Sequence, residues 1–439
     1  MRSLLKPAVV FVLAMLAGTT AVWAAPNVPD SGNTAWMLTS TALVLFMTLP
    51  GLALFYGGLV RSSNVLSILM QCFAITAVVS LLWLGGLYSL AFTSGGAWNN
   101  WIGGTSRILF AGMGPNTLGP NGIPEILFAM YQMTFAIITP ALIVGGYAER
   151  VRFSSMLVFS ALWTIFVYTP VCHWVWGGGF LQQKGLLDYA GGTVVHITAG
   201  VASLVAALVL GSRKGFPKQI SMPHNMTMTV TGAGMLWVGW FGFNAGSATA
   251  ANGAAAMALA ATHISAAAGA MTWMVIEWRR FGKPSVLGIV TGMVAGLGTI
   301  TPAAGSVGPG GALIVGAVAG VVCFTMTQMV KRVWQIDDSL DVFPVHGVGG
   351  ILGTLLAGLL CSPALGVWSG LGVSLPNHTV SQQFAVQIEG VVVTALYSGV
   401  VTLLVLALTR LVVGGVRVQP EQETEGLDIV LHEERGYDL

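Results

Sequence analysis

The chain alternates between long stretches of apolar and small residues and short segments in which its charged residues gather. Each apolar stretch has about 20 residues, the length that an α-helix needs to cross the roughly 30 Å hydrocarbon core of a membrane. A membrane β-barrel would instead show segments of about 10 residues with alternating hydrophobicity. The pattern predicts eleven membrane-spanning helices, at about residues 34–60, 64–93, 124–148, 153–175, 193–211, 226–247, 253–278, 286–302, 308–330, 343–361 and 385–413.

The composition supports this fold class, an all-α polytopic membrane protein. Of the 439 residues, 55% are hydrophobic and 8% are charged, whereas soluble domains are about 25% charged. The net charge of +2 is too small to suggest a nucleic-acid partner. The cysteines have neither metal-site nor disulfide spacing, and we expect core thiols at Cys72, Cys172, Cys323 and Cys361.

The N-terminal residues 1–25 have the features of a signal peptide. Arg2 and Lys6 form a basic start, Val9 to Leu16 an apolar centre, and Val22-Trp23-Ala24 a cleavage site. The alternative is an uncleaved first helix. Cleavage would leave the mature N-terminus outside the cytoplasm.

Lysine and arginine set the orientation, because cytoplasmic loops of membrane proteins are enriched in both. With the N-terminus outside, the outer loops of the mature chain receive only Arg107 and Lys184. The inner loops and tail receive Arg61, Arg150, Arg152, Arg213, Lys214, Lys218, Arg279, Arg280, Lys283, Lys331, Arg332, Arg410, Arg417 and Arg435. The predicted topology is therefore N-out and C-in, with an odd number of spans and a cytoplasmic tail at 414–439.

A spacing motif indicates an internal repeat. An aspartate is followed eight residues later by a histidine at Asp188…His196 and again, 150 residues further on, at Asp338…His346. Five spans in each repeat, about 34–211 and 226–361, would make the second repeat inverted relative to the first. Such a repeat would bring the two histidines together at the membrane midplane, and ionisable groups there mark a transport path. The last span, at about 385–413, lies outside the repeat.

The two histidines offer the clearest chemistry. Neutral imidazoles each have one donor and one acceptor nitrogen, so two adjacent rings can share a proton and present polar atoms to a small solute. The alternatives are that each histidine satisfies a neighbouring backbone group, or that the pair binds a metal in an intramembrane enzyme. The chain lacks His-Glu-x-x-His and shows no third ligand near His196.

The two aspartates admit different interpretations. For Asp338 we favour a cap at a helix N-terminus, or plain solvation. For Asp188, which has fewer charged neighbours, we favour a buried position from which it shapes an outer vestibule electrostatically.

These segments resemble the signatures of the ammonium transporter family, the Amt/Mep/Rh superfamily. The resemblance rests on the segments that begin at Asp188 and Asp341 and end at the two histidines, and on Phe55-Tyr56-Gly57-Gly58, Ala148-Glu149-Arg150, Trp176-Gly177-Gly178-Gly179 and Trp240 to Ser247. It extends from about residue 31 to about 432, and the signal peptide and tail resemble the bacterial Amt branch.

The resemblance implies a role for each matching residue. Phe135, Trp176 and Ser247 match an outer site that recruits ammonium, with Tyr131 at its rim and the acidic residue Asp188 nearby. A small cation gains about 0.5–2 kcal/mol from a good contact with an aromatic face. Phe135 and Phe243 match two stacked rings that close the pore, and His196 and His346 match the histidines that line it. Composition alone would have favoured plain core or interfacial roles for these aromatic residues.

The implied mechanism separates the charge from the carrier. Ammonium gives up its proton near the phenylalanine rings and crosses as ammonia, since a charge at the bilayer centre costs several kcal/mol. We expect net charge transfer. Two positions depart from the expected pattern: Tyr131, where many relatives have phenylalanine, and Pro344, two residues before His346.

The resemblance also implies partners and a location. The tail segment Glu425-Gly426-Leu427-Asp428, with the loop Arg213-Lys214-Gly215-Phe216, implies docking of a PII-type nitrogen-regulatory protein; a solvated acidic tail is the alternative. The expected assembly is a homotrimer in the bacterial inner membrane, with ammonium or ammonia, or methylammonium as analogue, as substrate. No cofactor and no enzymatic activity are expected. The competing function is an ammonium sensor, although only residues 414–439 remain for a signalling domain.

Overall fold

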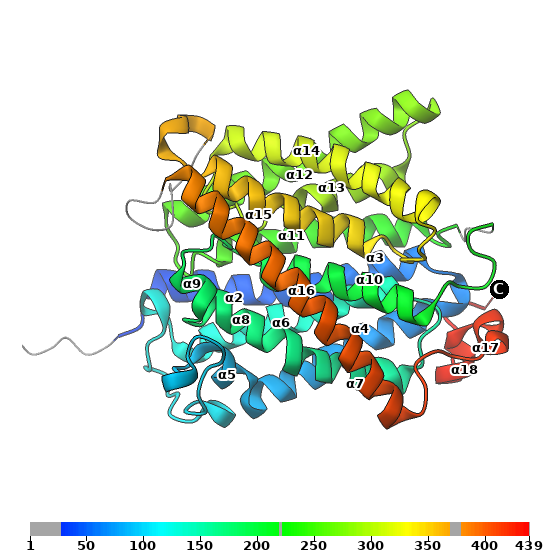
Figure 1. Cartoon of the computed structure of the whole chain (residues 1–439), viewed down its shortest axis with the longest axis horizontal. Helices are drawn as coiled ribbons and strands as arrows, with labels where there is room; N and C mark the ends of the chain where they lie inside the picture. Colours follow the sequence, from blue (N-terminus) through cyan, green and yellow to red (C-terminus); the bar gives the residue numbers. More distant parts are fainter. Residues whose placement is uncertain (1–27, 219–221, 369–378, 439) are drawn as a thin grey trace, which may run out of the picture.

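The computed structural model describes residues 28–218, 222–368 and 379–438, so the expected signal peptide lies outside the described residues. The described chain forms a bundle of long helices that run along one axis, with connecting loops gathered at its two ends (Figure 1). It contains two isolated β-bridges but no strand in this part of the chain. We call the end that holds residues 93–124 and 177–191 the loop end, and the opposite end, which holds the C-terminal segment, the tail end.

Helical segments occupy each of the five ranges expected in the first half. Several contain a π-helical turn (η1, η3, η7 and η8), which widens the helix locally and is frequent at functional sites. The segments are α2 (Ser31–Phe46), η1 (Met47–Leu52) and α3 (Ala53–Leu59); α4 (Val65–Leu82), η3 (Trp83–Leu87) and α5 (Tyr88–Phe92); α6 (Glu125–Tyr147); α7 (Phe153–Trp163), η7 (Thr164–Tyr168) and α8 (Thr169–Trp176); and, after the short α9 (Phe180–Gln183), η8 (Gly192–Ile197) and α10 (Thr198–Leu210).

The second half likewise has a helix at each of its six expected ranges. These are α11 (Met226–Gly246), α12 (Gly253–Phe281), α13 (Val286–Ile300), α14 (Pro309–Gln328) with η9 (Met329–Val333), η10 (Phe343–Gly347) with α15 (Val348–Leu360), and α16 (Val380–Val413). Two short helices, α17 (Pro420–Glu425) and α18 (Leu427–His432), follow in the tail.

The helices have the length and composition of membrane spans. Within the described residues, nine continuous helical segments are long and apolar enough to cross a membrane. The helix α13 is apolar but has 15 residues, and α11 has 21 residues but is rich in glycine and threonine. The all-α membrane fold is therefore confirmed.

Each half of the bundle is packed around one helix. Most of α6 is buried, so it serves as a central pillar for the first half. In the second half α12 packs between α13 and α14, where glycines allow close approach: a Cβ on Gly296 or on Gly316 would overlap the backbone carbonyl of Ser265. The four cysteines are buried, as expected of core thiols.

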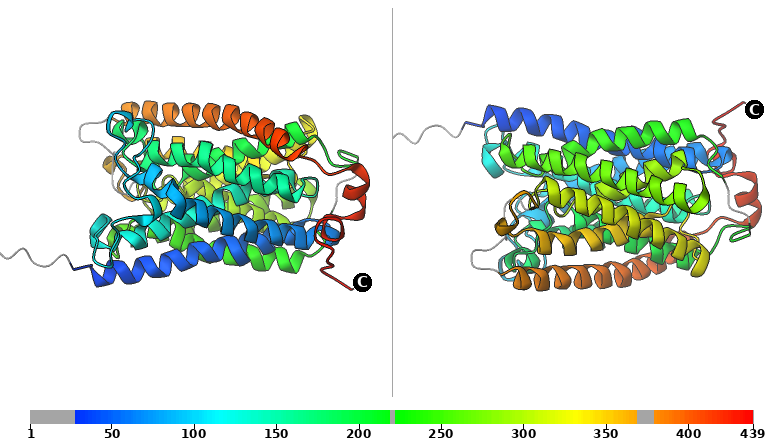
Figure 2. Two further views of the ribbon diagram at one scale, coloured as in Figure 1. Left: turned by 90° about the horizontal axis from the view of Figure 1, so that it is seen from below. Right: turned by 90° about the horizontal axis from the view of Figure 1, so that it is seen from above.

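The last span crosses the outside of the bundle and delivers the tail to one end. In Figures 1 and 2, α16 runs obliquely over one face, while α2 lies on the opposite face. The chain then turns at Gly414 and places α17 and α18 across the tail end, against the loops that follow the first, third and fifth spans. The two ends of the bundle are therefore covered differently, one by loops and the other by the tail helices.

Candidate functional site: a histidine-lined passage

Each aspartate–histidine pair forms a local unit in which the aspartate caps the π-helical turn that carries the histidine. In the first unit, the carboxylate of Asp188 accepts hydrogen bonds from the backbone amides of residues 191–194, at 2.6–3.2 Å, and from the hydroxyl of Thr193. The turn that follows, η8, carries His196. Asp188 is only 6% exposed. Its charge is therefore satisfied by the amide-rich N-terminus of a helix.

In the second unit Asp338 plays the same part with fewer partners. Its Oδ2 accepts from the amide of Phe343 at 2.6 Å, and its Oδ1 accepts from the hydroxyl of Ser203 at 3.2 Å. Asp338 is fully buried. The structure therefore agrees with the interpretation of Asp338 as a helix cap and not as a solvated carboxylate. Pro344 stands at one of the first two positions of η10, where a missing amide proton costs nothing.

The two units pack reciprocally. A Cβ on Gly200, which lies beyond the first unit, would overlap Gly347 beside His346. A Cβ on Gly350, 150 residues later, would come within 2.9 Å of the Cβ of His196. Each histidine therefore lies against the helix of the other unit, which brings the two rings together at the centre of the bundle.

The imidazoles of His196 and His346 lie side by side and are nearly parallel. Their Nδ1 atoms are 3.2 Å apart, the ring centroids are 5.2 Å apart and the ring planes differ by 17°. Because a neutral imidazole has one N–H, one Nδ1 donates to the other, and the pair shares a proton. The buried Nε2 of His196 has no hydrogen-bond partner in the described chain and can bind a small solute.

A narrow apolar passage surrounds the pair. Its volume is about 10 Å³, about the space of one water molecule. Apart from the two imidazoles and the indole of Trp240, its walls are aliphatic, thioether or phenyl groups, from Met47, Leu52, Phe55, Ile138, Leu142, Val195, Leu236, Phe243 and Val294. A bare ion would lose its hydration there without replacement.

An aromatic cavity of about 150 Å³ lies toward the loop end. It brings together Phe135, Trp176 and Ser247, three of the residues expected at an outer site. The rings of Phe135 and Trp176 are perpendicular, with centroids 5.8 Å apart. Phe135 also stacks on Phe243, at 4.2 Å and 23°, and this stacked pair separates the cavity from the histidine passage.

The polar groups around this cavity are oriented by their own hydrogen bonds. Ser247 donates its hydroxyl proton to the carbonyl of Phe243 at 2.9 Å, and its oxygen lies 3.3 Å from the hydroxyl of Tyr131. A hydroxyl oxygen has two acceptor lone pairs, so one remains for a ligand. The indole Nε1 of Trp176 donates to the carbonyl of Asp188 at 2.8 Å. Tyr131 directs its hydroxyl toward the carbonyls of Gly242 and Phe243, both at 2.9 Å, so its extra oxygen anchors α11 and does not line the cavity.

Asp188 occupies the buried position that was expected of it. Its side chain does not line the aromatic cavity, and both carboxylate oxygens are taken up by the cap of η8. It contacts the cavity only through its backbone carbonyl, which holds Trp176. Its side chain therefore supports the histidine turn.

Sequence reasoning missed four polar residues that line the cavity, namely Gln132, Gln182, Tyr189 and Thr249. Gln132 is 9% exposed, and neither its Oε1 nor the hydroxyl of Tyr189 has a hydrogen-bond partner in the described residues. A glutamine within an apolar span is a recognisable signal, since a buried amide needs a partner.

A second cavity of about 300 Å³ leads from His346 to the tail end. Charged and polar residues line it, including Glu277 and the ion pair of Lys331 with Asp341 at 2.6 Å. No group of three or more histidine, cysteine, aspartate or glutamate residues in the described chain is arranged to hold a metal ion.

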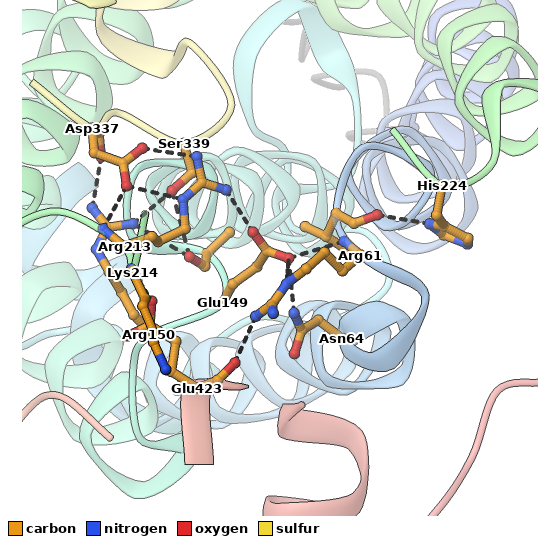
Figure 3. A network of polar contacts seen from close by, with 12 residues as sticks. Arg61, Asn64, Glu149, Arg150, Arg213, Lys214, His224, Asp337, Ser339 and Glu423 are labelled. Carbon is orange, nitrogen blue, oxygen red and sulfur yellow. Dashed lines mark hydrogen bonds and ion pairs between the residues drawn. The ribbon is translucent and has the colours of Figure 1, made fainter. Parts of the chain in front are cut away.

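A buried ion cluster lies at the tail end (Figure 3). Glu149 accepts from Arg61 at 3.1 Å, from Asn64 at 2.8 Å and from Arg213 at 2.5 Å. The guanidinium of Arg213 also forms a two-pronged pair with Asp337, at 2.8 and 2.9 Å. This cluster ties together the loops that follow the first, third and fifth spans and the loop that precedes the tenth.

Burial and pairing act in opposite directions on these groups. Burial alone would raise the pKa of Glu149, but the charge of Arg213 and the bonds from Arg61 outweigh it, so the pKa is lowered. The pKa of Asp337 is lowered in the same way by Arg213. Asp338 has no such partner: burial, with the nearby charge of Asp341, raises its pKa to about 6.

The tail completes this cluster. Glu423 accepts from the amide of Lys214 and from the guanidinium of Arg417, both at 2.7 Å. Asp428 caps α4, accepting from the amides of residues 66 and 67 at 3.0 and 2.7 Å. Both carboxylates are buried, 3% and 1% exposed, so the alternative of a wholly solvated tail is wrong for these two residues.

Comparisons with known proteins agree with this architecture. The model of the Ammonium Transporter Family matches residues 35–437. The chain is 48% identical over 413 residues to the ammonium transporter of Aquifex aeolicus (strain VF5), covering 93% of this chain and 94% of that one. The crystal structure of Saccharomyces cerevisiae Mep2 matches with a TM-score of 0.79 at 37% identity, over 89% and 91% of the chains. A structure named Sensor Amt Protein matches with a TM-score of 0.83 at 26% identity, over 91% and 98%.

Proposed function

This chain belongs to the ammonium transporter family, and we propose that it carries ammonium nitrogen across the bacterial inner membrane through the histidine-lined passage. The loop end faces the periplasm and the tail end the cytoplasm, because the tail end carries most of the arginine and lysine residues. Eleven spans then arise from two inverted sets of five and the last helix, α16.

Recruitment takes place in the aromatic cavity. The faces of Phe135 and Trp176 attract a cation, and the hydroxyl oxygen of Ser247 accepts one of its N–H groups. Tyr131 keeps α11 in place below the site. Asp188 acts through the position of Trp176 and η8, and its negative charge favours a cation on this side of the membrane.

Passage requires loss of the proton. The stacked rings of Phe135 and Phe243 block the cavity floor, and the passage beyond holds about one water-sized molecule among apolar walls. Neutral ammonia fits that space and can hydrogen-bond to the imidazoles, whereas ammonium or potassium would pay the cost of a buried charge. His196 and His346 relay the released proton inward, so that each turnover moves one net charge.

The shared Nδ1–Nδ1 contact carries this proposal. At 3.2 Å it links two imidazoles from different halves of the chain, within walls that offer few other hydrogen-bonding groups. Burying such a polar pair costs free energy unless its nitrogen atoms also contact a polar solute. The pair therefore supports a role in transport over a role in packing.

The assembly and the regulatory partner are part of the proposal. We expect a homotrimer with one passage in each subunit and a PII-type protein at the tail end. Arg213 is already paired with Glu149 and Asp337, so the surface for that partner consists of the more exposed Lys214, Glu421 and Glu425.

An electrical measurement tests the transport function. Purified protein in a solid-supported membrane should give a current after an ammonium jump and none after a potassium jump. Trp176→Leu should raise the ammonium concentration for half-maximal current several-fold and keep the maximal current, because a cation–π contact of about 1 kcal/mol is lost. Absence of current with ammonium uptake intact would limit the mechanism to neutral ammonia, and an unchanged half-maximal concentration would remove Trp176 from the site.

The sensor alternative receives less support. The structure named as a sensor is 26% identical to this chain, against 48% for the Aquifex aeolicus transporter. Uptake in cells that lack every other ammonium carrier distinguishes the two, since a sensor without transport would not restore growth on limiting ammonium.

A further inference from the structure

A third buried histidine lies outside the passage. His173 is on α8, one helical turn before Trp176, and is fully buried. Its Nδ1 is 2.8 Å from the backbone carbonyl oxygen of Ala91, and its Nε2 is 2.6 Å from that of Asn99. Both ring nitrogens therefore face atoms that can only accept a hydrogen bond.

This geometry specifies a protonation state. A neutral imidazole has one N–H, so one of the two contacts would set a nitrogen lone pair against a carbonyl lone pair. An imidazolium donates at both nitrogens, and hydrogen bonds from a charged donor are short and strong. His224 offers the matched contrast: its Nδ1 faces the carbonyl of Val60 at 2.8 Å, but its Nε2 faces the hydroxyl of Tyr437 at 3.0 Å, which can donate. A neutral ring satisfies His224 but not His173.

The carbonyl of Ala91 lies in the last turn of α5, and that of Asn99 lies in the loop that follows α5 at the loop end. Further hydrogen bonds join the same segment to the end of α8 and the turn after it: Trp174 Nε1 to the carbonyl of Trp101 at 2.8 Å, and Asn99 Nδ2 to the carbonyl of Gly178 at 3.1 Å. We call these contacts between residues 91–101 and residues 173–178 the seam, and His173 is buried at its centre. It is so tightly enclosed that a Cβ on Gly177 would come within 2.7 Å of its Nδ1.

We propose that His173 is a positioning residue for the outer cavity, held as an imidazolium that ties the loop segment 91–99 to the end of α8. The seam fixes the backbone from which Trp176 projects, and the indole has one further tether, the carbonyl of Asp188 at 2.8 Å. Loss of the imidazolium loosens Trp176 and weakens recruitment without altering the passage. The inference rests on the proposed role of Trp176 in ammonium recruitment.

The protonation state is tested on the wild-type protein, independently of transport. Solid-state NMR of protein labelled with ¹⁵N-histidine should show, at pH 7, one residue with two protonated ring nitrogens that is absent from His173→Gln or, if that variant does not fold, from His173→Asn. The signal of His224, assigned with His224→Gln, should be that of a neutral ring. A neutral ring at His173 would overturn the proposal.

The positioning role is tested by methylammonium uptake into proteoliposomes. His173→Gln should raise the apparent KM about three- to tenfold with the maximal rate within about twofold, since only the cation–π contact is weakened. His224→Gln, the same change at the tail end, should leave the KM unaltered. An unchanged KM in His173→Gln, or a fall in maximal rate with the KM unchanged, contradicts the role even when NMR finds the imidazolium. Wild-type protein that transports nothing rejects the proposed function and leaves the NMR result standing.

Discussion

The carboxylate of the first aspartate–histidine unit is held by four backbone amides and a hydroxyl, whereas that of the second receives one backbone amide and one hydroxyl. The histidines that the two caps support are nonetheless in equivalent positions, 3.2 Å apart. The first unit lies beneath the aromatic cavity, and the second lies beside Asp341 and the tail-end ion cluster. Two histidines in equivalent positions thus rest on one firm and one lightly held support, and the lightly held unit is the one beside the tail-end ion cluster.

The largest expected effect comes from the histidines, where the two units should behave alike. His196→Leu and His346→Leu should each lower methylammonium uptake into vesicles about 100-fold or more, since each removes one member of the proton relay. Protein levels in the membrane and thermal stability serve as the control for folding. Wild-type flux in both variants would refute the relay, and loss in only one would show that the units are not equivalent.

Replacing each capping aspartate with the neutral asparagine should destabilise the protein to different extents in the two units. Asp188→Asn places an amide NH₂ among five donors and should lower the free energy of unfolding by about 3 kcal/mol, against about 1 kcal/mol for Asp338→Asn. Asp30→Asn is the matched control, because Asp30 is an exposed cap of α2 and asparagine caps equally well. Thermal unfolding in detergent measures all three. Equal losses at Asp188 and Asp338 would contradict the difference in support.

The smallest expected effect is a pH dependence of stability in the second unit. The pKa of Asp338 is about 6 in the folded state and about 3.9 in an unfolded chain, so the folded state binds the proton more tightly. The stability that this group contributes is present below about pH 4 and is lost as the pH rises through about 6. The gap in Tm between wild type and Asp338→Asn should therefore widen as the pH falls from 7 to 5.

The neighbouring carboxylates provide the control for that measurement. The pKa values of Glu149 and Asp337 are lowered, so their stabilising contribution is present above the unfolded value near 4 and is lost only at lower pH. Between pH 5 and 7 they stay ionised, and the Tm gap between wild type and Asp337→Asn should be constant. If the Tm gap between wild type and Asp338→Asn is also constant between pH 5 and 7, the pKa of Asp338 is not raised in the folded state.

The sequence predicted the helices and the meeting of the histidines, because both follow from patterns along the chain. Apolar length determined the spans, and the 150-residue offset placed His196 and His346 in equivalent positions. What the sequence could not provide was the partner of each polar side chain. Asp188 was expected to be buried, but the sequence did not reveal that it caps η8, where four amides lie within its reach once the chain turns at Gly191.

Residues that act through contacts distant in the sequence also escaped prediction. The two ring nitrogens of His173 contact carbonyls more than 70 residues away in the chain. The buried pairing of Arg213 with Asp337 spans 124 residues. Such contacts depend on how helices pack, and no local pattern encodes them.

The docking of the tail has a consequence for biosynthesis. Asp428 caps the helix that begins near Leu66, 362 residues earlier in the chain. Because translation proceeds from the N-terminus, those amides enter the membrane long before their carboxylate has been made. A chain ended early by a late stop codon would possess every span and both histidines, yet at its tail end the amides of residues 66 and 67 would lack their carboxylate, and Arg61 would keep Glu149 but lose its bond to the carbonyl of Glu423. These contacts of the tail end therefore form only after the last helix and the tail have been synthesised.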